Sequence, residues 1–72
     1  MPSVTAPITG IIWKIRVAVG DQVAFEQVVV VIESMKLEIP VESEHEGVVH
    51  RIHVEEGDAV NEGDVLLLVS DT

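Results

Sequence analysis

The sequence lacks cysteine and tyrosine altogether, and its only aromatic residues are Trp13 and Phe25. Without cysteine the chain can form no disulfide bond and offers no thiolate for catalysis or metal binding. The longest apolar runs, residues 28–32 and 65–69, are far shorter than a membrane-spanning helix requires. The first residues also lack the basic and then apolar pattern of a secretory signal. We therefore expect a cytoplasmic protein with no membrane partner.

Basic side chains are scarce, since four Lys and Arg residues stand against 13 Asp and Glu, for a formal net charge of −9. Nucleic-acid binding depends on clustered Lys and Arg, so no nucleic-acid partner is expected. Ten of the acidic residues lie within residues 37–72, where Arg51 is the only Lys or Arg. That excess favours solubility, or alternatively provides a docking face for a basic enzyme surface.

A chain of 72 residues makes one small domain, residues 1–72, with little room to enclose a substrate. Val and Ile supply 22 of these residues, and such β-branched side chains favour strands. No segment shows a helical period. The predicted strands cover residues 3–6, 10–17, 28–33, 37–41, 47–54 and 65–69, with a short extended piece from Val23. The sequence thus predicts an all-β domain.

The sequence repeats itself after 37 positions, so that residues 10–23 align with residues 47–60, and residues 28–32 with residues 65–69. Two copies, residues 1–35 and 38–72, are too few for a solenoid. They predict instead a compact domain with pseudo-two-fold symmetry. The junction, residues 35–36, would then project from one end of the domain, and the two termini would lie at the other end.

A hairpin is predicted around that junction, because β-prone residues precede Ser34 and follow Lys36. Tight hairpin turns prefer Asn and Gly, which tolerate positive φ. Met35 and Lys36 do not share that preference, so a type I turn is expected here. The following strand contains Pro40, which cannot donate a hydrogen bond and therefore indicates an edge or strand-end position.

The alternation of apolar residues is broken in the first long strand. Ile12 has the wrong parity for the inward face that Ile15 and Val17 define, so a β-bulge near Trp13 is predicted. Trp13 itself occupies the position of His50 in the second copy and is expected to serve in packing.

Two kinds of turn recur in the two copies. Gly20 and Gly57, each followed by Asp, are predicted to adopt positive φ in equivalent turns. The second copy also has a typical turn sequence at residues 61–64. The first copy has Glu26 at the place of Gly63, which leaves a different turn shape open there.

Three histidines raise the question of a metal site. His50 and His53 are three residues apart on a predicted strand and should face opposite sides, while His45 lies in a loop. With no cysteine to assist, no metal is expected.

Together these features resemble the biotinyl/lipoyl attachment domain family, most closely its small stand-alone biotin carboxyl carrier proteins. The residues that carry the resemblance are Ala6-Pro7-x-x-Gly10, the two Gly-Asp-x-Val turns at residues 20–23 and 57–60, and Glu33-Ser34-Met35-Lys36. The resemblance implies a flattened antiparallel barrel or sandwich of two four-stranded sheets, the barrel-sandwich hybrid. Glu26 departs from the family pattern, which favours glycine there.

The resemblance also implies a function for the tip. A biotin protein ligase would attach biotin covalently to Lys36, which would then carry a carboxyl group between a biotin carboxylase and a carboxyltransferase. The flanking residues Glu33, Ser34, Met35 and Leu37 would be recognised by the ligase. Leu37 departs from the family, which most often has Met there, although Leu and Met are close in volume. Leu37 could otherwise be a strand residue that points into the core.

The chain itself is expected to be a non-catalytic carrier subunit of a biotin-dependent carboxylase. A lysine amine is almost wholly protonated at neutral pH, which makes Lys36 a better substrate for another enzyme than a nucleophile. Two alternatives remain: a lipoyl carrier of a 2-oxoacid dehydrogenase complex, and an unmodified structural or interaction module. Lipoyl domains usually have Asp-Lys at the tip, whereas this chain has Met-Lys, the biotin version.

Overall fold

Eight β-strands make up the regular structure of residues 2–71, the part of the chain that the computed structural model describes. They are β1 (Ser3–Thr5), β2 (Gly10–Ile15), β3 (Gln22–Val23), β4 (Val28–Ser34), β5 (Leu37–Glu42), β6 (Gly47–Ile52), β7 (Ala59–Val60) and β8 (Val65–Ser70). No helix lies within this part of the chain, so it contains no helix that could cross a membrane.

The strands form two four-stranded antiparallel sheets, with the orders β1-β8-β6-β3 and β5-β4-β2-β7. The repeat relates one sheet to the other, since β2, β3 and β4 begin 37 positions before β6, β7 and β8. Each sheet contains strands from both copies. The predicted all-β fold with two four-stranded sheets and pseudo-two-fold symmetry is confirmed.

The core between the sheets is aliphatic and follows the repeat residue by residue. The largest apolar side chains that are less than 2 % exposed form four pairs, each 37 positions apart: Ile12 and Val49, Val29 and Leu66, Val30 and Leu67, Ile32 and Val69. At about 25 cal/mol per Å² of apolar surface, the burial of such side chains is the main stabilising contribution. The repeat in the sequence therefore exists because two half-cores of the same shape pack against each other.

A β-bulge interrupts each long strand at the predicted place. The register between β2 and β4 shifts between Ile12 and Lys14, and the register between β6 and β8 shifts between Val49 and Arg51. Trp13 is the extra residue in the first copy, and its side chain is 38 % exposed, so the expectation that it serves in packing is wrong. A bulge turns its extra residue out of the ladder, which explains this exposure.

Each Gly-Asp turn is bound to the opposite copy by backbone hydrogen bonds. Gly20 N–H donates to Val49 O at 2.9 Å, and Gly57 N–H donates to Ile12 O at 2.8 Å. Both glycines have a φ of +96°, as predicted. The long strands leave the sheets at Ile15 and Ile52, two residues earlier than predicted, because the chain then enters these turns.

The turns at residues 24–27 and 61–64 have the same shape, although the first lacks glycine. Glu26 has a φ of 69° and Gly63 a φ of 92°. Glu26 N–H donates to Ser43 O at 2.7 Å, and Gly63 N–H donates to Ala6 O at 2.8 Å, where Ala6 and Ser43 are themselves 37 positions apart. A different turn shape is therefore excluded, and Glu26 adopts a left-handed conformation that disfavours non-glycine residues.

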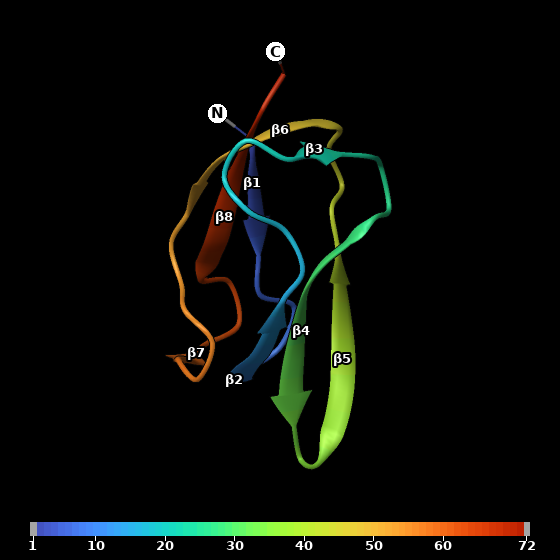
Figure 1. Ribbon diagram of the computed structural model, residues 1–72. Coiled ribbons are helices and arrows are strands. Elements are labelled where there is room, and N and C mark those ends of the chain that lie inside the picture. The colour runs from blue at the N-terminus through green and yellow to red at the C-terminus, as the bar shows by residue number, and fades with distance from the viewer. Residues whose placement is uncertain (1, 72) are drawn as a thin grey trace.

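The molecule is elongated, with dimensions of 36 × 18 × 18 Å. Figure 1 shows the turn between β4 and β5 at one end, whereas the start of β1 and the end of β8 lie together at the opposite end. This is the arrangement predicted from the repeat.

Replacing Glu26 with glycine should raise the free energy of unfolding by about 0.5–1 kcal/mol, because glycine avoids most of the left-handed strain but is more flexible when unfolded. Urea denaturation measures this change. As a matched control, Gly63→Ala should lower the free energy by about 1 kcal/mol. A Cβ added at Gly63 would have no atom within 4 Å other than those of its chain neighbours, so only backbone strain changes. Unchanged stability in both variants would contradict the prediction.

Candidate functional site

The hairpin of β4 and β5 carries the candidate lysine. The two strands are paired from Val28 opposite Glu42 to Ser34 opposite Leu37, which leaves only Met35 and Lys36 in the loop. Met35 has a φ of 52° and Lys36 a φ of 66°. Positive φ at both central residues is the property of a type I′ turn, so the type I turn expected from the sequence is wrong. The twist of the strands requires the primed turn in a two-residue loop.

The turn exposes the two loop side chains without support from neighbours. Met35 is 92 % exposed, and Lys36 is also exposed. Each residue in the left-handed region costs about 1–2 kcal/mol unless it is glycine. Such strain persists where the surrounding structure imposes it, and it is concentrated at functional sites. The turn at the end of the molecule therefore contains two residues, Met35 and Lys36, whose types disfavour the positive φ that they adopt.

The residues that flank the turn differ in exposure. Glu33 lies opposite Glu38 across the hairpin, and both are exposed. Ser34 is half-buried, whereas its cross-strand partner Leu37 is 65 % exposed. Leu37 thus does not point into the core, so that reading of the sequence is wrong. Met35 and Leu37, the sequence neighbours of Lys36, instead expose their apolar side chains to solvent.

The hairpin is tightly packed against β2 close to its turn. Ile11 lies opposite Glu33, and an added Cβ at Gly10 would lie 2.5 Å from Glu33 O. Real Cβ atoms do not approach a backbone oxygen so closely, which explains glycine at this position. Because β4 is held between β2 and β5, the strand that leads to the turn is fixed in place while the turn itself is in solvent.

The second lysine has different surroundings. Lys14 Nζ lies 5.5 Å from the centroid of the Trp13 ring, at the bulge of β2. Lys36 has no hydrogen bond or ion pair to any other residue in the range 2–71. Only one of the two lysine amines is therefore presented at the end of a protruding hairpin.

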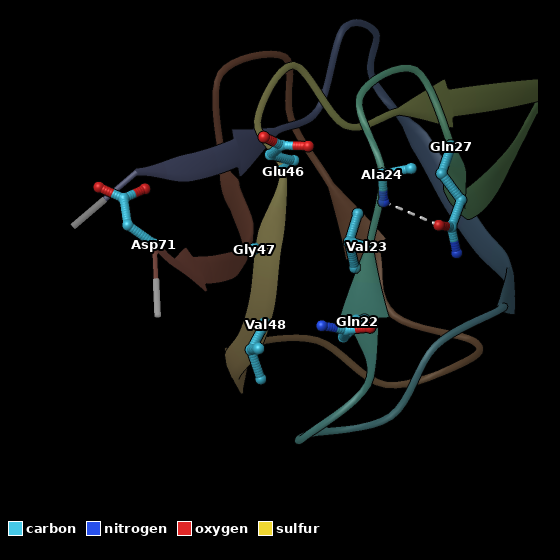
Figure 2. A pocket seen from close by; sticks show the side chains of 8 residues that line it. All are labelled: Gln22, Val23, Ala24, Gln27, Glu46, Gly47, Val48 and Asp71. Carbon is cyan, nitrogen blue, oxygen red and sulfur yellow. Dashed lines mark hydrogen bonds between the residues drawn. The ribbon is translucent and has the colours of Figure 1, made fainter.

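No alternative chemical site emerges from the described residues. Within residues 2–71, no three His, Asp or Glu side chains are grouped so that they could hold a metal ion. A groove with a volume of about 510 Å³ lies between β3 and β6. Figure 2 shows that apolar Val23 and Val48 line it, with Glu46 and Asp71 at its edge and Gln27 accepting a hydrogen bond from Ala24 N–H. Asp71 follows β8, so this groove lies at the end away from the hairpin turn.

Comparisons with known proteins agree with this geometry. Residues 1–69 match the family model described as biotin-requiring enzyme. The chain is 44 % identical over 70 residues to the Bacillus subtilis biotin/lipoyl attachment protein, covering 97 % of this chain and 96 % of that protein. It is 40 % identical over 65 residues to the Streptococcus mutans biotin carboxyl carrier protein, covering 90 % of this chain and 50 % of that one.

Among solved structures, the chain is similar to the Kluyveromyces lactis urea carboxylase, with a TM-score of 0.90 and 35 % sequence identity. This similarity covers 96 % of the present chain but only 6 % of the carboxylase chain. The fold described above therefore also occurs as a small part of a much larger protein.

The strain at the hairpin turn can be measured. The double substitution Met35→Asn and Lys36→Gly supplies the residues that a type I′ turn prefers, and should raise the free energy of unfolding by about 1 kcal/mol. The control Met35→Leu keeps an exposed apolar side chain in the same backbone conformation and should change it by less than about 0.5 kcal/mol. Urea denaturation of both variants makes the comparison. A double variant no more stable than the original chain would show that the turn is unstrained.

Proposed function

The chain belongs to the family described as biotin-requiring enzyme, and from this premise we propose that it carries biotin covalently on Lys36. Its relatives include biotin carboxyl carrier proteins and carboxylases, which supports the role of carboxyl carrier. The observation that carries the proposal is the position of Lys36, exposed in a strained two-residue turn at the end of the hairpin. No residue that the structure describes has to move for an enzyme to reach this amine.

The residues of the turn fit the attachment of biotin through its carboxyl group. A biotin protein ligase would first join the biotin carboxylate to the AMP group of ATP and release pyrophosphate. Lys36 Nζ would then attack the biotin carboxyl carbon, AMP would leave and Nζ would lose a proton, so that a neutral amide forms. When attached, biotin supplies a ring that accepts a carboxyl group at one enzyme site and releases it at another. The four methylenes of Lys36 would lengthen the flexible connection between this ring and the rigid hairpin.

We assign the flanking residues to recognition by the ligase. Glu33, Met35 and Leu37 are exposed around Lys36, so an enzyme that receives the amine would contact all three. Ser34 is half-buried and would contribute mainly through the shape of the turn. The fixed backbone of β4 and β5 would let the ligase distinguish Lys36 from Lys14, which lies at a bulge against Trp13.

The reactions themselves are assigned to partner enzymes, a biotin carboxylase and a carboxyltransferase. The relatives that are carrier proteins of biotin-dependent carboxylases support a non-catalytic role for this chain. The carrier would act by raising the local concentration of the attached group at each partner, which a tether achieves without new contacts. Met35 and the carboxylase relatives favour biotin over lipoate, although the name of the Bacillus subtilis relative covers both. A cytoplasmic location stays a prediction from the sequence.

Lys36→Arg should abolish capture by avidin after co-expression with a biotin protein ligase, because a guanidinium cannot form the amide. The charge and the backbone are kept, so the free energy of unfolding should change by less than about 0.5 kcal/mol. Lys14→Arg is the matched control and should be captured like the original chain. Capture of the Lys36→Arg variant would refute the assignment of the site.

The biotinylated chain should carry no labelled carboxyl group when it is incubated with labelled bicarbonate alone. Label should appear when a biotin carboxylase and ATP are added, and should leave the chain only with a carboxyltransferase and its acceptor. Omission of each component in turn is the measurement. Label on the chain without a carboxylase would overturn the carrier role, and so would biotinylated chain that no biotin carboxylase labels.

A further inference from the structure

A second surface with unusual chemistry lies away from the hairpin turn. It is a groove of about 280 Å³ between the turn at residues 24–27 and the end of β5. Phe25, one of the two aromatic residues of the chain, lines it and is 61 % exposed. Pro40 and Val41 contribute further apolar surface. An exposed aromatic ring beside apolar neighbours is a common feature of interaction sites.

The rim of this groove, which we call the Phe25 groove, is acidic. Glu26, Glu42 and Glu44 line it and are exposed, and no Lys or Arg is among its lining residues. The groove therefore combines an aromatic face with three carboxylates. A guanidinium group suits both features at once, since it stacks on aromatic rings and forms paired hydrogen bonds with carboxylates.

The two walls of the groove are held together by the backbone. Glu26 N–H donates to Ser43 O at 2.7 Å, and Ser43 N–H donates to Gln27 O at 2.9 Å. The buried Ser43 hydroxyl also accepts a hydrogen bond from His45 N–H at 3.1 Å, which fixes the loop that carries Glu44. A groove already formed in the free chain loses little freedom when a partner binds.

The pseudo-symmetry provides an internal comparison. The equivalent groove of the other copy is lined by Ser3, Val4, Thr5, Glu42 and Glu44, each 37 positions from a residue of the Phe25 groove. It has a volume of only about 70 Å³. Glu62 occupies the position of Phe25 and does not line this smaller groove. The aromatic wall is thus a departure from the symmetry of the fold, as is the presence of Glu26 where the other copy has Gly63 in the same left-handed conformation.

We propose that the Phe25 groove is a docking site for a partner protein, and that it receives an arginine flanked by apolar residues. Charge complementarity identifies this partner segment, because every charged residue that lines the groove is acidic and Phe25, Pro40 and Val41 provide apolar surface. Along the hairpin, the lining residue nearest to Lys36 is Pro40, four residues away, which at about 3.3 Å per residue is roughly 13 Å. A partner held there leaves the hairpin turn free.

An amide NMR titration of the whole chain tests the proposal. The probe is the peptide acetyl-Gly-Leu-Arg-Leu-Gly-amide, compared with the same peptide that has citrulline in place of arginine. We expect saturable shifts at the amides of the Phe25 groove, at least about threefold weaker binding of the citrulline peptide, and about three- to fivefold weaker binding to Phe25→Ala. Absence of saturable shifts, or affinity unchanged by Phe25→Ala, would overturn the proposal.

Two matched charge variants complete the test. Glu44→Gln removes a carboxylate of the rim and should weaken binding about twofold or more. Glu62→Gln makes the same change at the position equivalent to Phe25 and should leave the affinity unchanged. Equal losses in both would mean that the peptide responds only to net charge, and the docking site would be rejected. Phe25→Ala should keep its avidin capture, so failure of biotinylation in every variant would count against Lys36 and not against the groove.

Discussion

The structure depends on hydrogen bonds that each copy of the repeat provides to the other. Gly20 N–H donates to Val49 O, and Val49 N–H donates in turn to Asp21 O. The equivalent bonds join the second copy's turn to Ile12. Each sheet also takes strands from both copies, so neither half of the chain can complete a sheet by itself. Buried backbone groups require partners, and this requirement couples the two halves into one rigid scaffold.

The core residues follow the two-fold repeat, but several surface residues do not. The hairpin turn and the Phe25 groove both lie where the two copies differ. The hairpin turn between β4 and β5 joins the two copies, so it has no counterpart within either of them among the described residues. Phe25 has Glu62 as its counterpart. A symmetrical core thus provides stability without specifying function, and single positions on the surface are free to differ between the copies.

The sequence alone predicted the features that depend on burial, and it did not predict those that depend on backbone strain. The parity of Ile12 required a bulge, since an apolar residue on the wrong face would have been exposed, and the bulge is present. The conformations of Met35, Lys36 and Glu26 were not predicted, because these residue types disfavour positive φ. Here the twist of the paired strands and the bond from Glu26 to Ser43 override local preference. The balance between local preference and these tertiary contacts cannot be read from the sequence. The exposure of Trp13 was also not predicted.

The strain at the hairpin turn has a functional interpretation in terms of conformational freedom. A longer loop would relieve the left-handed conformations of Met35 and Lys36, but each added residue would bring about 1–2 kcal/mol of conformational entropy to be lost when an enzyme holds the lysine. A two-residue turn on paired strands leaves only the Lys36 side chain to be ordered. The folded domain thus bears a constant cost of strain, and under the proposed function an enzyme that acts on Lys36 would meet its backbone at a fixed position. Flexibility would then be confined to the Lys36 side chain and the biotin proposed to be attached to it.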